Sequence, residues 1–201
     1  GISNITIVKD KVSCNKLYSK DIGPGNCLID NWVRSNSNKK FDLNGEIASR
    51  GQINEIILEQ ALELFSNRKN KDKLSYDIND FDVSFARGLS LEDGAITLTE
   101  FTARIIGESL MNLIIEHKNT IKKILLCGGG RKNKFLVKKI KKYIPSDVKL
   151  ELIDSFGADG DFIESQAFAF LAIRSIKKLP ISFPGTTGCK KPCSGGELID
   201  Y

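Results

Sequence analysis

An acidic residue stands directly before a glycine-rich turn in the segment DIGPGN, residues 21–26. The two glycines can adopt positive φ and let the backbone approach a ligand closely. The asparagine can cap the amphipathic run that follows at 27–33. Backbone N–H groups at such a helix start can hold a phosphate, and Asp21 could accept a proton beside it. The segment therefore suits phosphate chemistry, although an ordinary strand-to-helix turn with a surface acid fits it as well.

Two further glycine-rich turns occur later in the chain, at residues 128–130 and 157–160. The first follows an apolar segment at 123–127 and precedes a basic run that Asn133 can cap. It lacks both the G-x-G-x-x-G spacing and a following Gly-Lys-Ser/Thr, so it is neither a Rossmann nor a Walker turn. Three glycines in a row could instead let a flat base or ribose lie against bare backbone. Because ligands gather at the carboxyl ends of strands in open α/β folds, these turns favour a nucleotide or phosphate ligand.

Glu164 is a second candidate carboxylate, near the start of a predicted helix that begins at about residue 162. Helical spacing places it on one face with Phe168 and Leu171. Acidic residues in a first helical turn stabilise the helix through its dipole. A carboxylate can also accept two hydrogen bonds from the paired hydroxyls of a sugar or polyol. Both interpretations remain open at this point.

The elements that would position these residues alternate between strands and helices. The patterns predict strands over 3–8, 123–127 and 148–153, and helices over 27–34, 45–66, 97–116 and 134–144. A turn near residues 9–11 would make the first strand part of a hairpin. The buried-type strand at 123–127, its helix and the strand at 148–153 form a βαβ unit with parallel strands. We therefore expect one α/β domain over residues 1–201.

Composition and charge exclude several classes of protein. The 201 residues are 41% hydrophobic and 27% charged, which is ordinary for a soluble globular protein. No run of about 18 apolar residues predicts a membrane span, and no signal peptide is visible, so we expect a cytoplasmic protein. The net charge of +5 comes largely from lysines between 122 and 149. Apolar residues at 136, 137, 140 and 144 form one helical face there, which favours a solvated surface helix over nucleic-acid binding.

The cysteines and the single histidine do not point to a metal site. Five scattered cysteines without a secretion signal indicate reduced thiols in a cytosol: Cys14, Cys27, Cys127, Cys189 and Cys193. The last two are four residues apart but have no second pair, which disfavours structural zinc. His117 ends a helical run, where a histidine is favoured by the helix dipole. The chain begins at Gly1, and its one methionine is Met111, so we expect a processed product or part of a longer polypeptide.

Four segments, taken in order, resemble the carboxyl-terminal half of anhydro-N-acetylmuramic acid kinases. They are GISN at 1–4, DIGPGN at 21–26, CGGGRKN at 127–133 and GDFIESQAFA at 160–169. The resemblance covers residues 1 to about 196. It implies an actin-like ATPase (ribonuclease H-like) lobe, with a mixed sheet flanked by helices, from the fold group of sugar kinases, heat-shock ATPases and actin. Two such lobes clamp ATP and substrate between them, so the amino-terminal lobe would be this chain's partner.

The resemblance also implies a reaction and roles for particular residues. ATP, with Mg²⁺, water and 1,6-anhydro-N-acetylmuramic acid would give ADP and N-acetylmuramic acid 6-phosphate, in bacterial cell-wall sugar recycling. Asp21 would be the catalytic base that takes a proton from the attacking water. The resemblance assigns phosphate contacts to Gly1, Asn4, Gly23 and Gly25, adenosine-side contacts to Gly128, Gly129 and Asn133, and sugar binding to Glu164.

Some features depart from the family pattern and keep alternatives open. Ile22 stands where the family usually has threonine, and the phosphate loop of the amino-terminal lobe, Gly-Thr-Ser-x-Asp-Gly, is absent. The chain alone is therefore expected to be inactive, and a non-catalytic remnant that binds nucleotide weakly is the main alternative. A basic nucleic-acid-binding module ranks last. A lobe built to face another exposes apolar surface when alone, so self-association, for instance as a homodimer, is expected.

Overall fold

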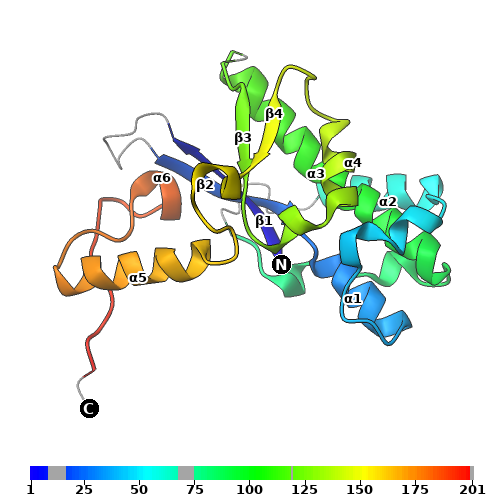
Figure 1. Ribbon diagram of the computed structural model, residues 1–201, viewed down its shortest axis with the longest axis horizontal. Helices are drawn as coiled ribbons and strands as arrows, with labels where there is room; N and C mark the ends of the chain where they lie inside the picture. The colour runs from blue at the N-terminus through cyan, green and yellow to red at the C-terminus, as the bar shows by residue number, and fades with distance from the viewer. Residues whose placement is uncertain (9–16, 68–74, 119, 200–201) are drawn as a thin grey trace.

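The computed structural model describes residues 1–8, 17–67, 75–118 and 120–199 (Figure 1). Its strands are β1 (Ile2–Val8), β2 (Leu17–Pro24), β3 (Lys123–Leu126) and β4 (Lys149–Leu152). Its helices are α1 (Cys27–Asn36), α2 (Glu55–Ser66), α3 (Leu91–Glu116), α4 (Lys134–Lys141), α5 (Ile163–Ile176) and α6 (Pro184–Thr187). The predicted turn near residues 9–11 lies outside the described residues. The chain is thus an α/β protein, as predicted.

The strands form two small sheets of different kinds. β1 pairs antiparallel with β2, from Ile2 opposite Pro24 to Val8 opposite Leu17, with one irregularity between Ser3 and Asn4. β3 pairs parallel with β4, which confirms the predicted βαβ unit. The described strands therefore make two separate two-stranded sheets and not one mixed sheet, because β1 and β3 share no ladder. A two-stranded sheet is marginal alone, so the helices must stabilise both.

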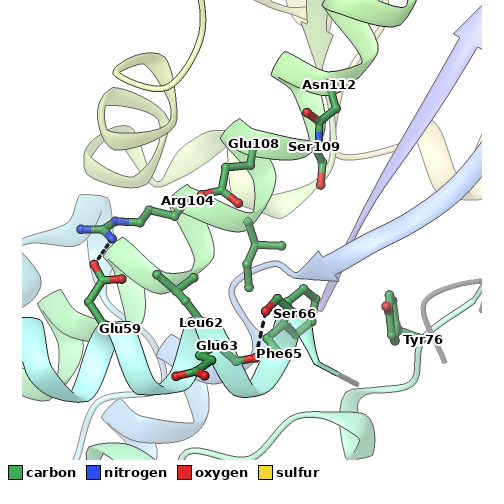
Figure 2. A pocket seen from close by; sticks show the side chains of 11 residues that line it. Glu59, Leu62, Glu63, Phe65, Ser66, Tyr76, Arg104, Glu108, Ser109 and Asn112 are labelled. Carbon is green, nitrogen blue, oxygen red and sulfur yellow. Dashed lines mark hydrogen bonds and ion pairs between the residues drawn. The ribbon is translucent and has the colours of Figure 1, made fainter. Parts of the chain in front are cut away.

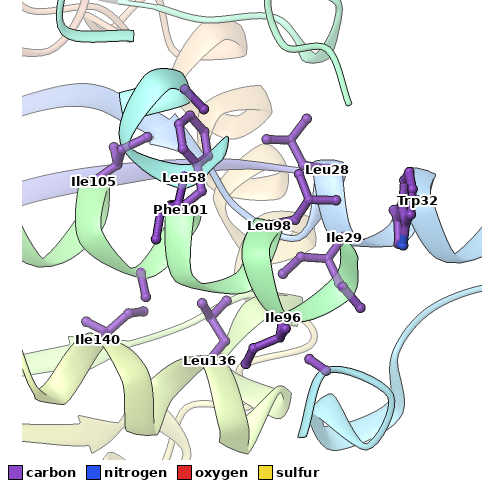
Figure 3. Packing of buried hydrophobic residues seen from close by; sticks show 14 of the residues in the cluster. Leu28, Ile29, Trp32, Leu58, Ile96, Leu98, Phe101, Ile105, Leu136 and Ile140 are labelled. Atoms are coloured by element: carbon purple, nitrogen blue, oxygen red, sulfur yellow. The ribbon is translucent and has the colours of Figure 1, made fainter. Parts of the chain in front are cut away.

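The long helix α3 is the centre of the hydrophobic core (Figure 3). It packs against α1, α2 and α4, whose buried residues include Leu28, Leu58 and Ile140. The apolar face predicted for this helix is buried, including Phe101 and Ile105. Each such side chain contributes roughly 1.5–3 kcal/mol of transfer free energy on burial. The helix starts earlier than predicted, because the Ser90 hydroxyl accepts a hydrogen bond from the Asp93 amide and caps it.

Two glycines inside α3 allow close packing by aromatic rings. A Cβ added to Gly94 would lie 2.2 Å from the Trp32 ring, and one on Gly107 would lie 2.3 Å from Tyr143 Cβ. Glycine in a helix interior costs about 1 kcal/mol relative to alanine. Close packing offsets this cost, because α1 and the segment after α4 can then approach α3 directly.

The structure corrects three predictions about the elements. The helix expected over 45–66 starts only at Glu55, because residues 43–50 form 3-10 turns in which Asn44 has φ 55° and Gly45 has φ 75°. β3 was expected to be buried, yet Leu125 is 44% exposed, because β3 belongs to a two-stranded sheet that leaves this side chain largely open to solvent. α5 has the apolar residues of a packed helix but buries none of them, and Phe168 is 65% exposed.

Candidate functional site

The hairpin of β1 and β2 brings Asp21 and Asn4 together. The two residues are opposite each other in the antiparallel register. Paired residues share one face, with Cβ atoms about 5 Å apart. Asp21 is half-buried, and its Oδ2 accepts a hydrogen bond of 2.7 Å from the backbone N–H of Tyr76. Sequence analysis did not find Tyr76, because a backbone amide carries no side-chain signal and residues 74–94 show no clear period.

The glycine turn after Asp21 is closed by the start of the chain. The carbonyl oxygen of Gly1 accepts hydrogen bonds from the amides of Gly25 at 2.8 Å and Cys27 at 3.4 Å. The sequence had suggested that N–H groups of this turn can bind a phosphate. These two are not available for that, because both donate to the Gly1 carbonyl. Gly25 does not adopt positive φ. It is needed because a Cβ there would lie 2.9 Å from the Gly1 oxygen, and one on Gly23 would lie 2.6 Å from Ile105 Cγ2.

The expected cap by Asn26 is wrong. Asn26 already has helical dihedral angles, φ −76° and ψ −5°, and its side chain makes no capping hydrogen bond. Its Oδ1 is buried without a hydrogen-bond partner in the described part of the chain. The Cys27 thiol lies at the same helix start, and burial raises its pKa despite hydrogen bonds with nearby backbone groups. A buried unpaired oxygen beside Gly25 marks this turn as polar and incompletely satisfied.

The triple-glycine turn forms an open ledge. A Cβ built on Gly128, Gly129 or Gly130 would have nothing within 4 Å. Gly128 has φ 74°, a conformation that favours glycine. Asn133 behaves differently, because it is buried and its Oδ1 caps α4 by accepting from the Leu136 amide at 3.1 Å. The ledge can therefore receive a flat ligand, whereas the oxygen of Asn133 is already engaged.

Arg131 links this ledge to the loop before α5. Its side chain is only 6% exposed and donates two hydrogen bonds of 2.9 Å to Asp154. It also donates to Asp161 at 2.8 Å and to the Gly128 carbonyl at 3.1 Å. The hydrogen bonds from Arg131 hold the pKa of Asp154 well below its usual range. Sequence analysis missed this cluster, although the aspartates at 154, 159 and 161 around two glycines were a signal for a structured loop.

Glu164 lies in the first turn of α5 and is exposed. Within the described residues, its carboxylate makes no hydrogen bond or ion pair to Asp21, to the ledge or to any other side chain. The structure thus joins Gly1, Asn4, Asp21, Gly23 and Gly25 in one group. It joins Gly128 to the loop that precedes Glu164 through Arg131.

A pocket of about 730 Å³ lies between α2 and α3 (Figure 2). It adjoins the Asp21 group, because Tyr76 and Ile105 belong to its lining. The lining is Glu59, Leu62, Glu63, Phe65, Ser66, Tyr76, Arg104, Ile105, Glu108, Ser109 and Asn112, and it contains none of the predicted site residues. Figure 2 shows that Arg104 reaches Glu59, with which it forms an ion pair. Three carboxylates against one paired guanidinium make the pocket unsuited to phosphate.

Other kinds of site are not visible in the described ranges. Residues 1–8, 17–67, 75–118 and 120–199 contain no group of three or more His, Cys, Asp or Glu side chains that could hold a metal. In the same part of the chain, no helix combines the length and hydrophobicity that crossing a membrane requires.

The fold and site define an α/β protein with an acid beside one glycine turn and an open glycine ledge after a parallel strand. The chain belongs to the anhydro-N-acetylmuramic acid kinase family, because the model of that family matches residues 1–200. An anhydro-N-acetylmuramic acid kinase of Pelagibacter ubique (strain HTCC1062) is 51% identical over 199 residues, which cover 99% of this chain and 53% of that protein. Kinases of the same description from Zymomonas mobilis and Caulobacter vibrioides are 37% and 35% identical, over 98% and 99% of this chain. The chain spans about half the length of these relatives.

Proposed function

We propose that this chain supplies one wall of the active site of an ATP-dependent kinase for 1,6-anhydro-N-acetylmuramic acid. The kinase opens the anhydro ring with water and yields N-acetylmuramic acid 6-phosphate in the bacterial cytoplasm. The observation that carries the proposal is the placement of Asp21, opposite Asn4 and beside a glycine turn, in a chain of this family. The facing wall would be an amino-terminal lobe, which would correspond to the half of the relatives that this chain does not cover. The two lobes would have an actin-like arrangement.

Asp21 is suited to act as the base. Its Oδ2 is held by the Tyr76 amide at 2.7 Å, which orients the carboxylate. Its Oδ1 has no hydrogen bond to another described residue and can take a proton from water. In the proposed step the water oxygen bonds to the anomeric carbon and its proton passes to Asp21. The bond from the anomeric carbon to O6 breaks. O6 then attacks the γ-phosphorus of ATP, the bond from that phosphorus to the β–γ bridging oxygen breaks, and ADP leaves.

The ledge at Gly128 and Gly129 fits an adenosine group, because bare backbone there leaves open space above both residues. ATP, when bound, supplies the phosphoryl group, and Mg²⁺ binds its phosphate oxygens. Gly1 closes the turn beside Asp21 through its carbonyl oxygen, and close packing at Gly23 and Gly25 excludes larger side chains there. Glu164 is proposed to accept hydrogen bonds from sugar hydroxyls, since its carboxylate is exposed and unpaired among the described residues.

The test is an ADP-release assay with the anhydro sugar. The chain is assayed alone and fused behind the amino-terminal half of the Pelagibacter relative, with that relative intact as the positive control. We expect turnover from the fusion only. Asp21→Asn should abolish it, whereas Asp147→Asn, the same change at an exposed ion pair, should not. Turnover that survives Asp21→Asn refutes the role of Asp21, and a folded but inactive fusion favours the non-catalytic alternative.

A further inference from the structure

We propose that Arg131 is a positioning residue that joins the glycine ledge at 128–130 to the start of α5. Through this connection, a nucleotide on the ledge and the segment that carries Glu164 influence each other. The inference rests on the proposed function for its nucleotide and sugar roles. It concerns two turns that are far apart in sequence and are joined mainly by the Arg131 guanidinium.

The geometry of the guanidinium supports a specific connection. Nε and Nη2 bind the two oxygens of Asp154, and Nη1 bridges Asp161 and the Gly128 carbonyl. Planar bidentate binding of this kind is a property of arginine that lysine cannot reproduce. Lys132 adds an ion pair of 2.6 Å to the other oxygen of Asp161. One side chain therefore contacts the first residue of the ledge and both ends of the 154–161 loop.

The loop is built closely around Arg131. A Cβ on Gly160 would lie 2.4 Å from Arg131 Nε, so the loop backbone lies directly against the guanidinium. The Gly160 amide also donates to Asp154 at 3.3 Å. Asp161 is followed by Phe162, whose carbonyl accepts the first hydrogen bond of α5, from the Gln166 amide at 2.8 Å. Fixing Asp161 therefore fixes the point at which α5 begins.

α5 depends on such contacts because it buries no residue of its own. Its other end is held by a hydrogen bond of 2.7 Å from Arg174 Nε to the Pro180 carbonyl and by one from the Ser175 hydroxyl to the Gly195 carbonyl. Both of these contacts lead to the tail of the chain and not to the ledge. Within the described residues, Arg131 and Lys132 are the residues whose charged side chains tie the start of α5 to the triple-glycine turn.

The connection also explains how a ligand on the ledge would change the structure at the start of α5. A ligand that changes the backbone at Gly128 changes the carbonyl that Arg131 binds. Arg131 can pass that change to Asp161, three residues before Glu164. Coupling of this kind is reciprocal, so a ligand that orders α5 must also favour binding at the ledge.

The experiment measures amide hydrogen exchange of the 201-residue chain, with and without saturating MgADP. In wild type we expect MgADP to slow exchange at residues 160–166. Arg131→Met should speed exchange there at least tenfold without ligand and remove the effect of MgADP, even at concentrations that saturate the variant. Arg131→Lys should restore only part of the slow exchange at residues 160–166 and only part of the effect of MgADP. Lys122→Met, which removes an exposed ion pair with Asp147, is the control and should change nothing at 160–166.

Three outcomes decide the inference. Equal exchange at 160–166 in wild type and Arg131→Met, or undiminished protection by MgADP in that variant, overturns it. Asp154→Asn removes the bidentate partner alone, so it replaces Arg131→Met if that variant does not fold. If neither this chain nor its fusion behind the amino-terminal half of the Pelagibacter relative binds MgADP, the proposed nucleotide site is wrong and the coupling with it, while faster exchange in the variant would still support the positioning of α5.

Discussion

Replacing Lys139 by methionine tests how the helices beside the ledge are held together. Lys139 Nζ, on α4, lies 2.7 Å from Glu100 Oε2, on α3, and the two side chains are 13% and 5% exposed. That oxygen has no hydrogen-bond partner of good geometry in the described residues, so the ammonium is its main compensation. The other oxygen accepts a hydrogen bond from the Tyr143 hydroxyl. The variant would leave a buried carboxylate with one neutral donor.

The expected loss of stability is large for a single surface-helix lysine. Breaking a buried ion pair costs about 3–5 kcal/mol. Because Tyr143 remains and Lys139 is partly exposed, we expect the lower end, about 3 kcal/mol. For a chain of this size that is about 9 °C in melting temperature. Lys138→Met is the matched control, since Lys138 is exposed on the same helix, and it should change stability by no more than about 0.5 kcal/mol.

Urea denaturation at several pH values is the assay. Burial alone would raise the pKa of Glu100, but the ammonium of Lys139 and the hydrogen bond from Tyr143 hold this pKa below its ordinary value of 4.5. A lowered pKa gives stability that is present above pH 4.5 and is lost as the pH falls. The penalty of Lys139→Met should therefore shrink below pH 4.5. Equal stability of the Lys139 and Lys138 variants at pH 7 would refute the reasoning.

Two further predictions concern packing and alkaline pH. Gly94→Ala should lower stability by about 1–3 kcal/mol, because the new methyl meets the Trp32 ring, whereas Gly129→Ala should change it by less than about 0.5 kcal/mol. The midpoints of urea denaturation measure the loss of stability in each variant. Equal losses would contradict the close packing of Gly94 against Trp32. Burial and the hydrogen bond with Glu100 raise the pKa of Tyr143 to about 12. A raised pKa gives stability that is present below pH 10 and lost between pH 10 and about 12, so wild type should lose more than Tyr143→Phe over that window.

The local patterns predicted the elements well where one strong signal decided them. The apolar period placed α3, and the cap residue Asn133 marked the start of α4. The helix predicted from residue 45 is absent before Glu55. Asn44 and Gly45 adopt positive φ at the start of that segment, which a helix does not allow. The pattern also failed for the burial of β3, since periodicity shows which residues are apolar but not which element covers them.

The candidate site shows the same division. The sequence by itself determined the family, through segments whose order and residue types are specific, and it singled out Asp21, Gly128 and Glu164. Only the tertiary structure decided how these residues are held. Tyr76 orients Asp21 by a backbone amide, and Arg131 joins the ledge to the loop before α5. These contacts span 55 and 30 residues, and hydrogen bonds over such separations depend on how the chain packs, which no local pattern of residue types encodes.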